Sequence, residues 1–337
     1  MKAKSKQLIS LALLLLLAIG QPLAGPGAQA GARAEPLAVR SVPLELLPGQ
    51  AEQAELGRLR YLGGLVLAAE GDVFGGYSGI AVDFDGGGLW AISDLGHWLR
   101  LDFARDAAGL PVDVMQARHL PLADARGQPV TRKSLSDAEA LRRLPDGSWL
   151  VGFERAHRFW TYAEPGGPAQ YTLPVPPGFE TQPDNGGAEA VAVWPNGDLL
   201  VLSEEKESGP GHTSVWLHQG GMQGGAWSDL SWPVRDGFKP TDAVALPDGD
   251  VLVLERYFTP LTGPKARISR VTMASIRPDA VLQPETLAEW ARPYSVDNME
   301  ALDMRRADDG SLWLYVMSDD NRNSLQRTLL MVFRLEK

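Results

Sequence analysis

The sequence of 337 residues contains no cysteine. This absence excludes disulfide bonds, a thiol for lipid attachment and thiolate metal ligands. The motifs of several enzyme classes are also missing: there is no phosphate-binding P-loop, no H-E-x-x-H and no dinucleotide fingerprint, and Gly76–Ile80 departs from G-x-S-x-G at its last position. The sequence therefore disfavours a conventional serine esterase, a zinc peptidase and a nucleotide-dependent dehydrogenase.

Long apolar runs are absent apart from one near the N-terminus. Three lysines among the first six residues precede the apolar stretch Leu8–Ile19, and Ala28-Gln29-Ala30 offers a small-x-small cleavage site. This pattern predicts a signal peptide over residues 1–30, with a second cleavage option at Ala32-Arg33-Ala34. The stretch is shorter than a membrane span, so we expect a periplasmic or secreted protein without a stable membrane anchor. The alternative is an uncleaved anchor.

Positive charge is scarce relative to negative charge. The formal net charge is −10, and removal of residues 1–30 would take away three lysines and no acid. A surface of this sign argues against a nucleic-acid partner, because phosphate backbones require a basic footprint. It is compatible with bound cations. The oligomeric state is left open by the sequence.

A repeated hairpin pattern is the most informative feature of the chain. Each copy begins with a small residue and an acid, continues with alternating apolar residues and a Gly turn, and ends in an apolar strand followed by a polar or acidic residue. Asn-Gly and Asp-Gly turns strongly indicate hairpins. Successive acid positions, counted from Gly79 in the first copy, are 60, 50, 53 and 58 residues apart, which is the size of a four-stranded propeller blade. The copies are Ser78–Asp94, Ala138–Glu154, Ala188–Glu204, Thr241–Glu255 and Met299–Asp319.

These repeats predict an all-β protein, a β-propeller in which five blades are favoured and six are the alternative. The sixth blade would be an irregular one within residues 36–70. The fifth repeat lacks an outer strand after Leu335, and an orphan strand at Arg58–Leu67 is predicted to fill that place and close the ring. The predicted organisation is a signal peptide (1–30), an N-terminal extension (31–57) and one propeller domain (58–337). Ala123–Ser136 is predicted as an insertion, and Thr259–Lys265 as a loop.

The acids at the starts of the repeats predict a site. First strands of blades line the propeller axis, so like-positioned residues gather at one channel mouth. Crowded carboxylates need protons or a cation, and an oxygen-only environment favours Ca²⁺, with Mg²⁺ or Mn²⁺ next. The alternative is that each acid only clamps the neighbouring blade. The predicted metal ligands are Glu139, Glu189, Asp242 and Glu300, with a second set of acids at Asp94, Glu154, Glu204, Glu255 and Asp319.

Other polar residues follow the second strands. Asp94 and Glu154 are predicted to take part in catalysis together with His97 and His157, which follow them by three residues. The alternative for the histidines is a loop position packed on Trp98 or Phe159. Four basic residues are predicted to bind an anionic group of a small-molecule substrate, with ion pairing to neighbouring acids as the alternative. They are Arg155, Lys206, Arg256 and Arg322.

Several stretches resemble the bacterial family described as "esterase-like activity of phytase", the Phytase-like family. They are Phe74–Ile80, Ala91–Asp94, Asn185–Ala190, Asp297–Leu302 and Ser318–Asn321, and the resemblance extends over about Arg58 to Leu335.

The resemblance implies a secreted or periplasmic propeller that hydrolyses phosphate or other esters. Together with the divalent cation expected from the acids, this predicts a metal-dependent hydrolase. The repeat acids, Glu139 among them, occupy the family's recurring positions. Gly79 leaves the ring of acids incomplete in the first repeat, where Asp94 could compensate. The net negative charge disfavours a polyphosphate substrate unless cations bridge it. The alternatives are a non-catalytic binding or scaffolding propeller and a lactonase-type hydrolase, because the fold alone does not separate these functions.

Overall fold

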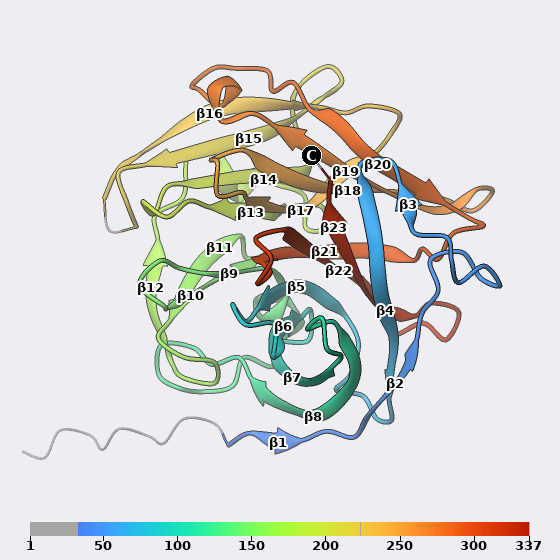
Figure 1. Ribbon diagram of the computed structural model, residues 1–337. Coiled ribbons are helices and arrows are strands. Elements are labelled where there is room, and N and C mark those ends of the chain that lie inside the picture. Colours follow the sequence, from blue (N-terminus) through green and yellow to red (C-terminus); the bar gives the residue numbers. More distant parts are fainter. Residues whose placement is uncertain (1–32, 223, 337) are drawn as a thin grey trace, which may run out of the picture. The chain divides into compact units, whose positions relative to one another are not determined.

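The chain folds into five antiparallel sheets arranged as the blades of a ring, as the computed structural model shows for residues 33–222 and 224–336 (Figure 1). This confirms the predicted five-bladed β-propeller. The inner strands β5, β9, β13, β17 and β21 contact one another in this order around the ring, and β21 contacts β5. The predicted signal peptide lies outside the described residues. None of the described helices is long and apolar enough to cross a membrane.

Each blade runs from its inner strand to its outer edge in chain order. Blade one contains β5 (Tyr77–Val82), β6 (Gly88–Ser93), β7 (His97–Arg105) and β8 (Pro111–Pro121). Blade two contains β9 (Ala138–Arg143), β10 (Trp149–Phe153), β11 (Arg158–Tyr162) and β12 (Ala169–Leu173). Blade three contains β13 (Ala188–Val193), β14 (Leu199–Gly209), β15 (His212–Gln219) and β16 (Ala226–Pro233). Blade four contains β17 (Lys239–Ala245), β18 (Val251–Thr259), β19 (Gly263–Val271) and β20 (Glu285–Ala291).

Blade five is completed by the N-terminal part of the chain. Its first three strands are β21 (Asn298–Arg306), β22 (Leu312–Asp319) and β23 (Thr328–Leu335), and its fourth is β4 (Leu59–Ala69). β4 pairs antiparallel with β23, so the prediction that an N-terminal outer strand closes the ring is confirmed. The residues predicted as an extension also form strands: β1 (Glu35–Pro36) pairs with β8, while β2 (Val39–Pro43) and β3 (Glu55–Leu56) pair with β4.

The turns between first and second strands follow from their sequence. Each contains a glycine at positive φ, such as Gly147 at 88°, which residues with a side chain rarely adopt. In the part of the chain that the structure describes, short helical segments occur only in connections, namely α1 (Lys133–Ser136), η1 (Phe179–Thr181) and η2 (Met273–Ser275). α1 ends the predicted insertion. The predicted loop Thr259–Lys265 is instead the tip of the extended β18–β19 hairpin.

The hydrophobic core lies between the blades. Five clusters of buried apolar residues fill the five interfaces between neighbouring blades. In the interface of blades one and two, for example, the Trp98 ring packs edge-on against Trp149 and Tyr162, at centroid distances of 5.8 and 5.5 Å. Because packing is satisfied between the blades, the central channel can hold polar groups.

A buried ion pair occupies this channel. The guanidinium of Arg142 on β9 contacts the carboxylate of Asp242 on β17, and both residues are at most 5% exposed. Arg142 also donates to the carbonyls of Ile80, Val191 and Ala243, and Asp242 Oδ2 accepts from the backbone N–H of Leu302 at 2.7 Å. The pair therefore ties all five inner strands together.

Candidate functional site

The inner strands begin around a cavity of about 250 Å³, which we call the acid cavity. Carboxyl groups outnumber cationic groups in its wall by eight to three. So many carboxyl groups in so small a volume cannot all ionise without a counter-charge. The acids are Asp94, Asp137, Glu139, Glu154, Glu189, Glu204, Glu300 and Asp319, and the cations are Lys133, Arg155 and Arg256.

A β-bulge at the start of each inner strand positions the first group of side chains. On β9, for example, Ala138 and Ala140 pair with consecutive residues of β10, so Glu139 between them is unpaired. A bulge of this kind re-aims a side chain, and here three bulged glutamates line the acid cavity. The bulged residues in blades one to five are Ser78, Glu139, Glu189, Thr241 and Glu300.

Blade four differs from the predicted alignment by one residue. Thr241 is the bulged residue, and Asp242 pairs with Leu254. The structure therefore does not bring Asp242 to the acid cavity with the other predicted metal ligands, but places it against Arg142 in the channel. Blade one shows the same one-residue difference, because Ser78 and not Gly79 is bulged.

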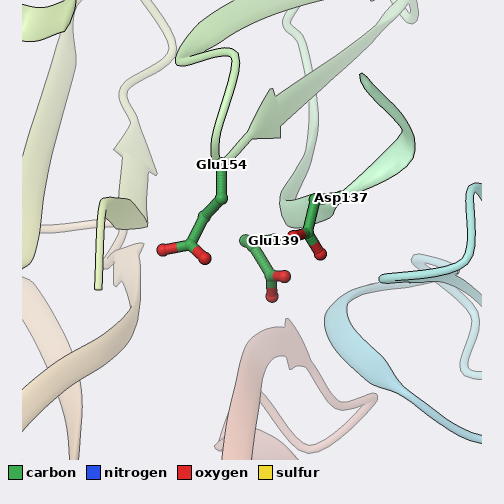
Figure 2. A group of neighbouring side chains, drawn as sticks. All are labelled: Asp137, Glu139 and Glu154. Atoms are coloured by element: carbon green, nitrogen blue, oxygen red, sulfur yellow. The ribbon is translucent and has the colours of Figure 1, made fainter. Parts of the chain in front are cut away.

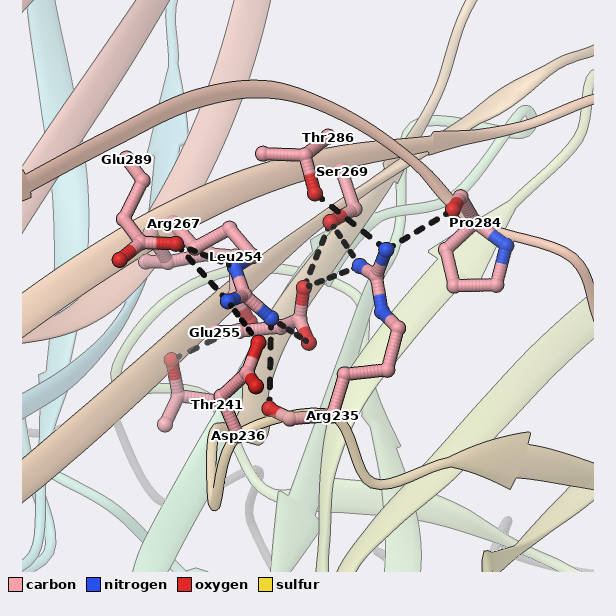
Figure 3. Close-up of polar contacts among 10 residues, drawn as sticks. All are labelled: Arg235, Asp236, Thr241, Leu254, Glu255, Arg267, Ser269, Pro284, Thr286 and Glu289. Carbon is pink, nitrogen blue, oxygen red and sulfur yellow. Dashed lines mark hydrogen bonds and ion pairs between the residues drawn. The ribbon is translucent and has the colours of Figure 1, made fainter.

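The one-residue difference in blade four also applies to the residues of its second strand, β18. Arg256 takes the place that Glu204 has in blade three, so a cation enters the acid cavity where the other blades supply acids. Glu255 points elsewhere: it is fully buried, accepts a hydrogen bond from Ser269 at 2.6 Å and forms an ion pair with Arg235 (Figure 3). Glu255 is thus held inside blade four and does not reach the acid cavity.

Three acids of blade two form the tightest cluster. One carboxylate oxygen from each of Asp137, Glu139 and Glu154 lies within 4.8 Å of the other two (Figure 2). Asp137 precedes β9 and Glu154 follows β10, and the Glu154 N–H donates to the Asp137 carbonyl at 2.9 Å. The hairpin pairing therefore holds the two ends of the cluster together across Glu139.

Three carboxyl groups of the cavity, which we call the deep carboxyl groups, lack cationic partners. Asp137 forms ion pairs with Lys133 and Arg155, but none is found for Glu139, Glu154 or Glu189 among residues 33–222 and 224–336. Burial, followed by the charges of neighbouring acids, raises the pKa of Glu139 and of Glu189 well above the usual value.

The pKa of Glu154, the third of the deep carboxyl groups, is also raised. Burial raises its pKa, although its Oε1 accepts hydrogen bonds from the backbone N–H groups of Gly186 and Gly187, and these oppose the shift. The deep carboxyl groups must therefore bind protons or share a bound cation.

The other side of the cavity is partly neutralised. Arg256 Nη2 donates to Glu204 at 2.8 Å, and Arg256 Nε lies 3.0 Å from Glu300. Burial still raises the pKa of Glu300 to about 8 against the opposing charge of Arg256, and raises the pKa of Asp319 to about 7. Both carboxyl groups therefore titrate near neutral pH, where a side chain can take up and release protons.

Only some of the residues predicted for catalysis and substrate binding reach this cavity. Asp94, Glu154, Arg155 and Arg256 line it. Asp94 contacts Lys133 at 2.8 Å, and Arg155, at a positive φ of 57°, reaches Asp137 and the Asn185 side chain. The residues that do not line it are His97, His157, Lys206 and Arg322.

Each of these four side chains has another environment. His97 packs against His119, and His157 contacts the Gln182 carbonyl and the ring of Phe179. Burial lowers the pKa of both His97 and His157. Lys206 donates to Thr181 at 2.7 Å, and the Arg322 guanidinium lies 3.9 Å from exposed Asp72.

Residues 72–322 match the family described as "esterase-like activity of phytase". The chain belongs to the Phytase-like family. The resemblance of the sequence motifs to this family is thereby confirmed. No curated protein sequence matches the chain.

Solved propeller structures resemble this Phytase-like chain distantly. A protein of unknown function from Dyadobacter fermentans is 12% identical, with a TM-score of 0.43 over 91% of this chain and 95% of that one. A putative gluconolactonase is 14% identical, with a TM-score of 0.42 over 92% and 96%. Virginiamycin B lyase from Staphylococcus aureus is 12% identical, with a TM-score of 0.38 over 88% and 100%.

Two charged residues of the acid cavity were missed from the sequence, namely Asp137 and Lys133. The alternation Asp137-Ala138-Glu139 is the signal that could have identified the first of them. The bulge positions also have a sequence signal: each of the first four lies seven residues before the Asp or Asn of its Gly turn. Counting back from the turn gives Thr241 in blade four, whereas matching acid to acid gives Asp242.

Proposed function

We propose that this Phytase-like chain is an exported, cation-dependent hydrolase of phosphate or other esters, and that the acid cavity is its active site. The observation that supports the proposal is that Glu139, Glu154 and Glu189 line the acid cavity without a cationic partner among the described residues, next to the guanidinium groups of Arg155 and Arg256. Buried acids with raised pKa values in a cavity are typical of functional sites.

The side chains fit a hard divalent cation. Asp137, Glu139 and Glu154 offer oxygen ligands only, and the Asn185 side chain is in the same wall. Ca²⁺ is the preferred ion because it accepts six to eight oxygen ligands in flexible geometry. When bound, the cation would supply Lewis acidity and neutralise the deep carboxylates.

The remaining residues have roles that follow from their contacts. Arg155 and Arg256 use only some of their five N–H donors in ion pairs, so each can also bind an oxygen of an anionic substrate. The ionised form of Asp319 or Glu300 accepts a proton from the attacking water. A protonated carboxyl of the same cavity returns a proton to the leaving oxygen as the ester bond breaks.

The test is a hydrolysis screen with phosphate monoesters, carboxylic esters and lactones, in EDTA and in Ca²⁺. Glu139→Gln and Glu154→Gln should each lower kcat/KM by at least about a hundredfold, since acid/base and electrostatic groups contribute on that order. The matched control is Glu164→Gln, an exposed glutamate in the same blade, which should keep full activity. Full activity of both cavity variants would refute the proposed site.

A non-catalytic binding propeller is the second candidate, and the ion pairs of Asp137 and Arg256 support it. Lys133, Arg155 and Arg256 already satisfy several acids, as a purely structural clamp would. Under this hypothesis no ester or lactone is hydrolysed with any divalent ion. Turnover of lactones alone would instead favour a lactonase-type hydrolase.

A further inference from the structure

A second and larger cavity adjoins the acid cavity. It has a volume of about 580 Å³ and shares Arg256 and Asn321 with the acid cavity as wall residues. Its sides are the tip of the β18–β19 hairpin and the connection between β22 and β23. Both segments lie at the end of the channel where the acids gather, so the two cavities meet at Arg256 and Asn321.

Exposed apolar side chains line this second cavity. Phe258 is 60%, Leu261 94% and Leu325 88% exposed. These are three of the 11 exposed large hydrophobic residues in the described part of the chain, and all three line one cavity together with Pro260 and Pro264. Exposed apolar residues that gather in this way mark a binding surface, whereas scattered ones do not.

The carboxyl group in the wall of this cavity, that of Asp297, is already hydrogen-bonded. Asp297 accepts hydrogen bonds from the Asn298 N–H at 3.0 Å, the Gln326 side chain at 3.3 Å and the Arg327 N–H at 3.1 Å. The apolar walls are therefore the part of the cavity that gains most from a ligand.

The sizes of the two cavities indicate which part of a substrate each one can hold. Sites for organic ligands usually measure about 300–1,000 Å³, so the acid cavity alone is small and the second cavity is within the range. We propose that the second cavity binds the apolar acyl or alkyl group of an ester whose reacting group lies in the acid cavity. The substrate is then an amphiphilic ester and not a polyphosphate. This inference rests on the proposed function and specifies its substrate class.

The experiment measures chain-length dependence by two independent readouts. The first is kcat/KM for p-nitrophenyl esters from acetate to octanoate and for matching alkyl phosphates. The second is calorimetric affinity for alkylphosphonates from methyl to octyl, which the protein cannot hydrolyse. Each added methylene should improve both quantities by up to about fourfold until the cavity is filled.

The test variant is Leu261→Ser/Leu325→Ser, and the control is Met115→Ser. The altered leucines are almost fully exposed, and Met115 is a 65% exposed residue on the outer strand β8. The double variant should lower the ratio of octyl to methyl affinity, and of octanoate to acetate kcat/KM, by at least about tenfold. The control should keep the wild-type ratios.

The outcomes separate this inference from the proposed function. Chain-length-dependent affinity without any turnover supports the apolar subsite and refutes the hydrolase. Turnover without chain-length dependence refutes the subsite. Equal ratios in the wild type and the double variant also refute it. If the double variant instead changes only the molar mass in light scattering, the patch is an interface between copies of the chain and the subsite is wrong.

Discussion

Replacement of Arg142 by methionine should strongly destabilise the propeller without acting through the acid cavity. Arg142 is 5% exposed and Asp242 fully buried. Loss of the guanidinium leaves Asp242 without its ion pair, and leaves the carbonyls of Val191 and Ala243, among others, without a donor. Removal of one partner of a buried pair costs about 3–5 kcal/mol. This is a large part of a typical stability of roughly 5–15 kcal/mol.

The assay is reversible urea unfolding followed by tryptophan fluorescence, with the free energy of unfolding obtained by linear extrapolation. Asp242→Leu should cost a similar amount, and the double variant Arg142→Met/Asp242→Leu clearly less than the sum, because no unpaired charge then remains. Arg143→Met, at the neighbouring position of β9, is the control and should change stability by less than about 1 kcal/mol.

The free energy of unfolding of Arg142→Met should also depend more strongly on pH than that of the wild type. Burial raises the pKa of Asp242 to about 7 while the charge of Arg142 opposes this shift, so loss of Arg142 raises the pKa further. A carboxyl group with a raised pKa in the folded state stabilises at low pH and loses this contribution as the pH rises through that pKa. A cost below about 1 kcal/mol for Arg142→Met, or strict additivity in the double variant, would refute the account of the channel.

Three further predictions concern the acid cavity and its surroundings. In EDTA the melting temperature should fall as the pH rises from 5 to 8, because the pKa of Glu300 is raised to about 8 and that of Asp319 to about 7 in the folded state. Glu300→Gln should reduce this fall. If the variant shows the same dependence of melting temperature on pH as the wild type, Glu300 is not the group responsible. Arg256→Met should move the pKa that Glu300 contributes to the pH–rate profile upward by about one unit or more, since the charge of Arg256 lowers the pKa of Glu300. Gly79→Ala should cost about 1–3 kcal/mol in urea unfolding, because a Cβ there would lie 2.7 Å from the backbone nitrogen of Leu141. Ser78→Ala should cost about 1 kcal/mol or less, because it adds no atom and removes only the hydroxyl that hydrogen-bonds Glu139; a larger cost for Ser78→Ala than for Gly79→Ala would argue against the bulge register.

The fold could be predicted from the sequence because each repeat contains the local signals of a blade. Glycine turns, strand alternation and the spacing of the copies determine blades, and the unpaired edge of blade five predicts the closing strand β4. The position of the acids around one channel mouth followed from the same repeat for Glu139, Glu189 and Glu300.

The details of the site could not be predicted because they depend on register and on long-range contacts. A bulge moves a side chain to another direction without changing the strand pattern, so Asp242 and Thr241 could be distinguished only through the turn. Nothing local in the sequence indicates that His157 is engaged by Gln182, or that Lys133 reaches Asp94 across 39 residues. The adjoining cavity likewise forms from two loops that are far apart in the chain.

Calcium binding to EDTA-treated protein tests the central claim most directly. Isothermal titration calorimetry at pH 7.5 should show a bound ion in the wild type and in Glu164→Gln, and none in Glu139→Gln, because Glu139 is the middle member of the cluster with Asp137 and Glu154. Equal binding by all three proteins, or no binding by the wild type, would contradict a cation site in the acid cavity.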